Sequence, residues 1–264
     1  NANSLRDPIR QLDTYDVAIL DTLGEVNWLD EVFNSAPTQR YSLSASGGGD
    51  NGSFYLLGEY SSQEGVFKRQ RYDKYLLRFN GDIGTKKFRV GNNISFSYTD
   101  RDVINSSGDG GGPGNELSGI RYALIAAPVF PIYDQNGNYN NTSSTLGDPT
   151  LYGDGNANPL AFIDATNWTV QRYRFFGNVF AEYKFLPNLT FRTNLGADIL
   201  FQDETIFKER LSAAIYDPTS LSRGNVTDRT MIWNNTLDYS TSIGASKSHN
   251  VSLLIGMEAI ENRT

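Results

Sequence analysis

Residues 173–185 decide the fold, and they read YRFFGNVFAEYKF. The odd positions carry aromatic, small or aliphatic residues, whereas the even positions include Arg174, Asn178, Glu182 and Lys184. Side chains of a strand alternate between two faces, so this segment predicts a strand with one apolar and one polar face. Its apolar face has aromatic residues at both ends and smaller residues between them, which is typical of a strand that crosses a lipid bilayer.

Two further segments repeat this pattern, at residues 189–202 and, with Asn92 interrupting the apolar face, at residues 88–98. We therefore expect Val179, Ala181, Leu195 and Ala197 to face lipid, and Arg174, Glu182, Arg192 and Asp198 to face a barrel lumen. Weaker alternation occupies residues 39–46, 53–62, 72–83, 227–241 and 250–261, so the sequence predicts eight strands.

The connections between these strands alternate in length. Short links lie at residues 47–52, 84–87, 186–188 and 244–249, and long ones at about 63–71, 100–171 and 203–226. Outer-membrane barrels have short periplasmic turns and longer external loops, so this alternation favours a barrel over a soluble β-sandwich. The predicted fold class is all-β, an antiparallel transmembrane β-barrel segment of about eight strands with long extracellular loops.

The same topology places both ends of the chain outside the cell. Residues 1–38 show no alternation and are expected to form an extracellular loop region with short helices, and residues 39–264 the transmembrane strands. A single-chain barrel normally starts and finishes on the periplasmic side. We therefore expect the chain to be a piece of a larger barrel, with further strands on both sides.

Composition narrows the function. The 264 residues include 15 Tyr, 15 Phe and 25 Gly, a mixture that suits strands joined by turns. Cysteine is absent, which excludes disulfides and thiolate chemistry. A formal net charge of -7 argues against nucleic acid as a partner, because phosphates require a concentrated basic surface.

The long connection at 100–171 contains signals for local order. A helix is predicted over residues 116–126 and ends at Pro128 and Pro131. A small hairpin is predicted over residues 132–139, because Asn136-Gly137 is a strong two-residue turn signal.

Catalysis finds little support in this sequence. The only histidine, His249, lies in a predicted short turn, and the chain has no thiol nucleophile. Glu182 and Asp198 share the predicted lumenal face but lie several rungs apart, so we interpret them as polar lining. We expect no catalytic residue, no bound metal and no cofactor.

Several stretches resemble a known family. Residues 28–33 (WLDEVF), 36–48 (APTQRYSLSASGG) and 58–60 (GEY) resemble the segment that opens the barrel of SusC-like TonB-dependent outer-membrane transporters. Residues 131–139 (PIYDQNGNY), 158–161 (NPLA) and 181–191 (AEYKFLPNLTF) are also similar to that family. The resemblance covers most of the chain, and Glu59 departs from it where the family often has a small residue.

The resemblance implies a barrel of about 22 strands with a plugged lumen, of which this chain supplies about the second to the ninth. It implies import of a nutrient, an oligosaccharide rather than a peptide, energised by TonB through a plug region absent from this chain. It also implies a SusD-like surface lipoprotein on the outer loops, including parts of 1–38 and 100–171. The location implied is the outer membrane of a Gram-negative bacterium, in the Bacteroidota.

Aromatic residues in the predicted outer loops are the candidate ligand-binding residues. Their flat faces can stack on sugar rings, although packing within a large loop explains the same residues. They are Tyr133, Tyr139, Tyr152, Trp168 and Tyr216. Two other readings stay open, a small closed barrel that acts as a passive pore or adhesin and a secreted β-sandwich that binds glycans.

Overall fold

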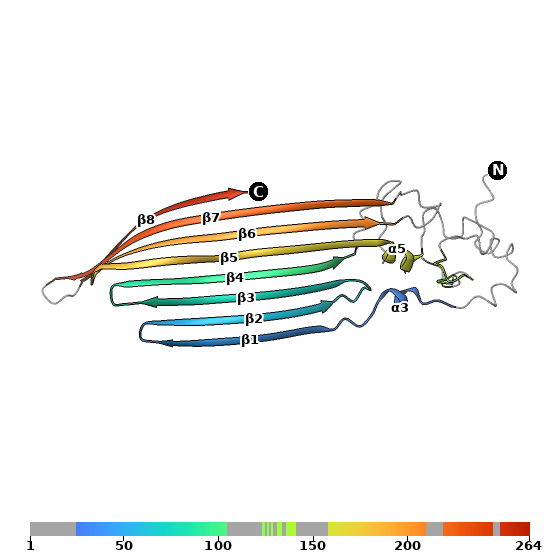
Figure 1. Ribbon diagram of the computed structural model, residues 1–264, viewed down its shortest axis with the longest axis horizontal. Helices are drawn as coiled ribbons and strands as arrows, with labels where there is room; N and C mark the ends of the chain where they lie inside the picture. Colours follow the sequence, from blue (N-terminus) through green and yellow to red (C-terminus); the bar gives the residue numbers. More distant parts are fainter. Residues whose placement is uncertain are drawn as a thin grey trace.

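A computed structural model describes eight antiparallel strands in one sheet (Figure 1). The strands are β1 (Thr38–Gly49), β2 (Gly52–Glu64), β3 (Arg71–Gly84), β4 (Phe88–Val103), β5 (Thr166–Leu186), β6 (Leu189–Lys208), β7 (Ser220–Ile243) and β8 (His249–Arg263). Two short helices are α3 (Trp28–Val32) and α5 (Pro159–Ala165). The structure describes residues 25–104, 123–124, 126, 128, 131–133, 136–140, 158–209, 219–244 and 249–264.

Every strand pairs with its neighbours in sequence, in the order β1 to β8. Within the described ranges β1 and β8 are the two edges and do not pair with each other. The prediction of an all-β, antiparallel sheet of eight strands that does not close on itself is therefore confirmed. In the part of the chain that the structure covers, no helix combines the length and the apolarity that a membrane span requires.

The register keeps the two predicted faces separate. Val179 lies opposite Leu195, whereas the Arg174 guanidinium forms an ion pair with Asp198. Glu182 lies opposite Arg192, and both residues are on the same face of the sheet as Arg174 and Asp198. Because neighbouring residues point to opposite faces, the apolar set and the charged set lie on opposite sides of the sheet, as the sequence predicts.

A tyrosine ladder crosses the apolar face from β1 to β5. Each tyrosine is the register partner of the next, and the ring centroids of successive members are 6.5, 4.9, 6.0 and 4.7 Å apart. The ladder consists of Tyr41, Tyr60, Tyr75, Tyr98 and Tyr173, and the register continues it to Phe201 on β6. Such cross-strand aromatic pairs stabilise a sheet beyond the area they bury.

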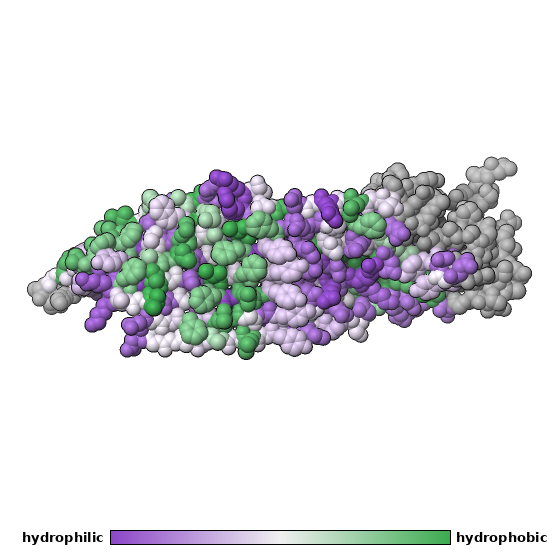
Figure 2. Space-filling model, viewed as in Figure 1, coloured by the Kyte–Doolittle hydropathy of each residue, from purple (hydrophilic) through white to green (hydrophobic). Residues whose placement is uncertain are grey.

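A second aromatic row lies nearer the short turns. Phe88, Tyr183 and Phe191 are register partners on β4, β5 and β6. On β5 this row is 10 positions from the ladder, from Tyr173 to Tyr183. Between the two rows the apolar face carries aliphatic residues together with Phe79, Phe96 and Phe175. It remains uncovered, with Leu77 59% and Leu195 47% exposed. Figure 2 shows this apolar band over the half of the sheet next to the short turns.

No second sheet covers the apolar face within the described residues, and all eight strands belong to one sheet. A soluble sandwich would bury this face against an opposing sheet. The uncovered face is therefore the feature that separates a barrel wall from the sandwich alternative.

The strands extend further than the sequence predicts. β5 begins at Thr166, β6 ends at Lys208 and β7 begins at Ser220, so the connections expected at 100–171 and 203–226 are shorter than predicted. Trp168, assigned to a loop, lies in β5, and His249, assigned to a turn, is the first residue of β8. The added ends of β5, β6 and β7 are polar and are held in the sheet by backbone hydrogen bonds. Because they lack alternating apolar residues, the hydrophobic pattern of the sequence does not predict them.

We predict that arginine is tolerated on only one face of this sheet. In the full-length protein, Leu195→Arg should lower stability by about 2–4 kcal/mol, because it places a charge on the expected lipid face. Thr230→Arg is the matched control, since Thr230 lies opposite Asp198 on the polar face. The readout is the temperature at which the barrel purified in detergent loses its folded, compact migration on gels. Equal loss in the two variants would contradict the assignment of faces.

Candidate functional site

The candidate site lies at the end of the sheet opposite the short turns (Figure 1). Here α3, α5 and the turn between β2 and β3 pack into the main buried apolar cluster of the described residues. The buried members are Trp28, Val32, Phe67, Ala123, Leu160 and Ile163. We call this the end cluster.

α3 is held against the turn between β2 and β3 by main-chain hydrogen bonds. The N–H of Lys68 donates to the carbonyl oxygen of Val32 at 3.0 Å, and the N–H of Asn34 donates to that of Val66 at 2.8 Å. The rings of Phe33 and Phe67 meet edge to face with centroids 5.5 Å apart. The side chain of Asn27 caps the helix by accepting from the Leu29 N–H.

Asn158 joins α5 to the predicted hairpin. Its side chain is fully buried, and its Oδ1 accepts from the N–H groups of Leu160 and Ala161 at 3.0 and 3.3 Å. Its Nδ2 donates to the carbonyl oxygens of Ile132 at 2.8 Å and Asn140 at 3.4 Å. One amide thus satisfies a helix N-terminus and two loop carbonyls, which fixes the hairpin beside α5.

The hairpin presents a stacked pair of tyrosines. Tyr133 and Tyr139 form an antiparallel bridge, and their ring centroids are 5.3 Å apart at an interplanar angle of 24°. Gly137 has a φ of +82°, in the left-handed region that glycine adopts without strain, and five residues separate the two tyrosines rather than a two-residue turn. Tyr133 is 51% exposed, so one aromatic face remains available to a ligand. The hairpin prediction is confirmed.

Tyr139 and Arg69 converge on Asp164 of α5. The Tyr139 hydroxyl donates to Asp164 Oδ2, and Arg69 Nη1 lies 3.1 Å from Asp164 Oδ1. Burial raises the pKa of Tyr139, and the bond to Asp164 raises it further, so the hydroxyl stays protonated and keeps donating. Arg69 has a φ of +66°, a left-handed conformation unusual for a residue with a side chain.

A hollow of about 490 Å³ lies beside this cluster, at the ends of β2–β5. Its lining includes Glu64, Arg69, Asp102 and Trp168, so it presents both charges and an indole. The Trp168 Nε1 is buried and has no hydrogen-bond partner. A buried donor without a partner is costly, which sets this N–H apart from the satisfied polar groups around it.

The structure brings together three of the five aromatic residues predicted from the sequence. Tyr133 and Tyr139 stack, and Trp168 lines the adjoining hollow. Tyr152, Tyr216 and most of the predicted 116–126 helix lie outside the described residues, although Ala123 and Leu124 are helical. No sequence pattern singles out Arg69 or Asp164 as a site residue, and Asn158 stands out only within the stretch 158–161 that resembles the family. The pair Asn158-Pro159, a cap followed by proline at the first helical position, signals this helix start.

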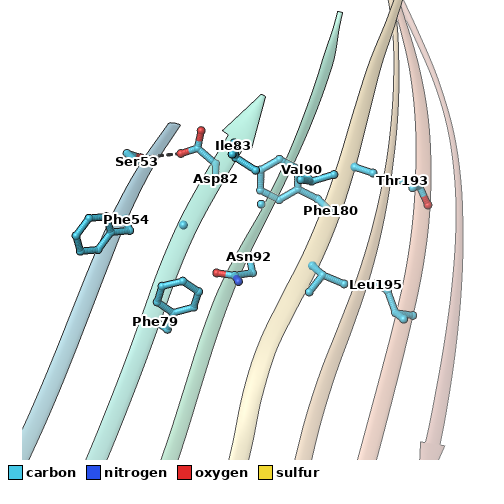
Figure 3. A pocket seen from close by; sticks show the side chains of 14 residues that line it. Ser53, Phe54, Phe79, Asp82, Ile83, Val90, Asn92, Phe180, Thr193 and Leu195 are labelled. Carbon is cyan, nitrogen blue, oxygen red and sulfur yellow. Dashed lines mark hydrogen bonds between the residues drawn. The ribbon is translucent and has the colours of Figure 1, made fainter. Parts of the chain in front are cut away.

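A second hollow, of about 580 Å³, lies on the sheet itself (Figure 3). Its lining is mainly apolar and includes Phe54, Phe79, Val90 and Leu195, which share the face of the tyrosine ladder. A face of this kind suits lipid rather than a polar solute.

The carboxylates considered for catalysis have arginine partners. Asp198 accepts from Arg174, and Glu182 lies opposite Arg192. In the described ranges no three His, Asp or Glu side chains are grouped to hold a metal ion.

Known proteins resemble this chain in sequence and in fold. No family model matches it. The TonB-dependent receptor P3 of Formosa agariphila is 29% identical over 241 residues, covering 87% of this chain and 22% of that protein. The TonB-dependent receptor SusC of Bacteroides thetaiotaomicron is 25% identical over 193 residues, covering 67% of this chain and 18% of that protein. The chain thus spans about a fifth of the length of these curated relatives.

Solved structures share the fold. The RagAB peptide importer in its closed-closed state matches with a TM-score of 0.72 at 22% identity, covering 91% of this chain and 26% of that chain. The same importer in its open-open state gives a TM-score of 0.72 at 21% identity.

We predict that Asn158→Ala loosens the hairpin and α5 without affecting the sheet. The lost cap costs about 1 kcal/mol, and leaving the Ile132 carbonyl unsatisfied costs roughly 1–3 kcal/mol more. Hydrogen exchange in the full-length protein should therefore quicken in residues 131–140 and 158–165, and stay unchanged in β5 and β6. Asn158→Ser is the control, because its hydroxyl caps α5 but cannot reach Ile132. Unchanged exchange in Asn158→Ala would show that this amide does not hold the hairpin.

Proposed function

We propose that this chain, whose sequence and fold are those of SusC-like TonB-dependent outer-membrane transporters, forms part of the barrel wall of a nutrient importer. The observation that carries the proposal is the uncovered apolar face, bounded by two aromatic rows and backed by a polar face. Lipid on one side and a polar lumen on the other satisfy both faces at once.

The spacing of the aromatic rows supports a bilayer span. About 9–11 residues of tilted strand cross the hydrocarbon core. The 10 positions between Tyr173 and Tyr183 lie within that range. Aromatic rings settle at the two membrane interfaces, so we assign the tyrosine ladder to the outer interface and the second row to the periplasmic one. The end cluster then lies outside the membrane, where an arriving ligand meets it.

We favour a neutral oligosaccharide as the imported nutrient. The exposed ring of Tyr133 offers a stacking surface, and the Asp164 carboxylate is bonded to its stacking partner Tyr139, so polar groups lie close to this pair. A peptide is the alternative, because the structures that share this fold are described as peptide importers.

The partners follow from the same proposal. A SusD-like lipoprotein rests on the outer loops, and TonB energises import through a plug. We place it in the outer membrane of a Gram-negative bacterium of the Bacteroidota; the SusC relative comes from Bacteroides thetaiotaomicron. The single open sheet gives no support to a small closed pore or adhesin, and the uncovered face none to a glycan-binding sandwich.

The decisive experiment measures uptake. A strain with the transporter gene deleted is complemented with the full-length gene and offered labelled neutral oligosaccharides and labelled oligopeptides. We expect accumulation of an oligosaccharide that requires the gene and stops when a protonophore removes the energy source of TonB. Accumulation that survives the protonophore would show a passive pore, and accumulation of peptides alone would overturn the substrate class.

We predict that shortening residues 108–165 in the full-length transporter preserves insertion into the outer membrane and reduces uptake or lipoprotein association. The strand contacts of β4 with β5 do not depend on this connection, whereas the tyrosine pair and α5 are part of it. Membrane fractionation, uptake and co-purification of the lipoprotein are measured together. Tyr133→Ala is the matched point variant. Normal uptake and association in a correctly inserted deletion would refute a function for this connection.

A further inference from the structure

The hollow of about 580 Å³ on the apolar face lies in the half of the sheet next to the short turns (Figure 3). On β5 its lining includes Val179 and Ala181, which are four and two positions from Tyr183 of the second aromatic row. Tyr173 of the tyrosine ladder is further away along the same strand. The hollow therefore belongs to the periplasmic half of the proposed membrane span.

Two phenylalanine rings form one wall of the hollow, and both lie against glycines. A Cβ built on Gly47 would lie 2.8 Å from the ring of Phe54, and one built on Gly81 would lie 3.3 Å from the ring of Phe79. Each ring thus occupies space that a glycine leaves open. Ala181 adds a small side chain to the lining, so the hollow keeps its depth between the rings and the far strands.

The polar groups of the lining are already shielded or bonded. Thr193 Oγ1 accepts from the indole N–H of Trp233 at 3.1 Å. The Oδ1 of Asn92 is shielded from solvent and has no partner among the described residues, so hydrocarbon over the hollow would remove no further water from it. Asp82 is the charged residue of the lining, but its side chain belongs to the opposite face and is bonded to Arg89.

The turn between β3 and β4, directly below the hollow, is basic. Thr85 Oγ1 accepts from the N–H groups of Lys87 and Phe88 at 3.3 and 3.2 Å, which fixes the turn. Lys86 and Lys87 are exposed and form no ion pair within the described residues. The N–H of Lys184 donates to the carbonyl oxygen of Lys87 at 2.8 Å and brings a third positive side chain to the turn.

The neighbouring short turns are not basic. The turn from β1 to β2 carries Asp50, and the turn from β5 to β6 consists of Pro187 and Asn188, without charge. Among the short turns that the structure describes in full, the basic one joins β3 to β4, and both of these strands line the hollow. Free positive charge and an apolar recess therefore occur together at one place on the wall.

We infer that this place binds an anionic phospholipid of the periplasmic leaflet, with its phosphate at Lys86 and Lys87 and an acyl chain in the hollow. The inference rests on the proposed function, because it needs the apolar face to meet lipid. From Phe88 to Asn92, at the far end of the hollow, the strand rises by ~13 Å at ~3.3 Å per residue. One leaflet of hydrocarbon is about 15 Å deep, so an acyl chain that starts at the turn reaches along the hollow.

The charge of the turn favours lipid over a second copy of this chain. Two copies that met symmetrically through the hollow would bring their basic turns toward each other, and like charges disfavour such an interface. An anionic headgroup instead neutralises the turn. Lysine clusters at a membrane surface attract anionic lipids in this way.

The test titrates the full-length transporter, purified in detergent and stripped of lipid, with phosphatidylglycerol and with phosphatidylcholine of the same acyl chains. Native mass spectrometry gives the affinity for the first bound lipid. Lys86→Gln combined with Lys87→Gln should weaken phosphatidylglycerol roughly tenfold and change phosphatidylcholine little. The matched control is Lys68→Gln combined with Lys74→Gln, which removes two lysines at the opposite end of the sheet.

A second pair of variants tests the hollow. Ala181→Phe should weaken both lipids, because its ring fills the space of the acyl chain. Ala259→Phe is the control, since Ala259 on β8 shares the face of Leu195, through Trp233, and lies outside the hollow. In the wild type, phosphatidylglycerol with a photoreactive acyl chain should label residues 79–83, 90–92 and 179–181, a readout that depends on no variant.

Equal affinity of the wild type for the two lipids overturns the inference, as does an equal loss in both lysine pairs. Labelling confined to other strands also overturns it, and so does glycerol phosphate binding as tightly as the whole lipid. A dimer that Ala181→Phe abolishes would show that a second copy covers the hollow instead. Solubility of the transporter without detergent would contradict the barrel wall itself, whereas a detergent-dependent barrel without lipid preference loses this site alone.

Discussion

The structure depends on one constraint, a register that is kept across eight antiparallel strands and shifts only between Lys184 and Leu186, beside the turn from β5 to β6. A slip of one residue between any two strands would exchange their faces, because side chains alternate with a period of two. The register instead brings tyrosine opposite tyrosine from β1 to β5, and asparagine opposite asparagine from β3 to β5 and again from β6 to β7. These two rows lie on opposite faces, so the same pairing that orders the apolar surface also orders the polar one.

The two faces meet different needs and are stabilised differently. The apolar face relies on stacked rings and on a medium that replaces a protein core, whereas the polar face relies on paired charges and amides. Arg174 with Asp198, and Arg89 with Asp82, hold neighbouring strands together on the polar face through charge-assisted hydrogen bonds. Neither face resembles the interior of a soluble domain, which explains why the main apolar cluster of the described residues lies at one end of the sheet.

The end cluster shows how one end of the sheet can hold exposed aromatic side chains in a fixed position. A few buried residues and the Asn158 amide hold a hairpin whose tyrosines are otherwise exposed. The polar contacts among Arg69, Tyr139 and Asp164 then restrict the orientation of the pair.

The sequence by itself determined the strands and their faces, because the alternation of apolar and polar residues can be recognised within one strand, before its partner strands are known. It also predicted the hairpin at Tyr133–Tyr139 from the Asn-Gly pair. The same alternation did not predict the polar ends of β5, β6 and β7, because the backbone hydrogen bonds that hold them in the sheet do not depend on apolar side chains. Only the tertiary structure placed Trp168 in a strand and joined Asp164 to Arg69, which lies 95 positions away in sequence. It alone aligned Asn80, Asn93 and Asn178, because cross-strand register depends on the pairing of distant segments, and no single strand contains that information.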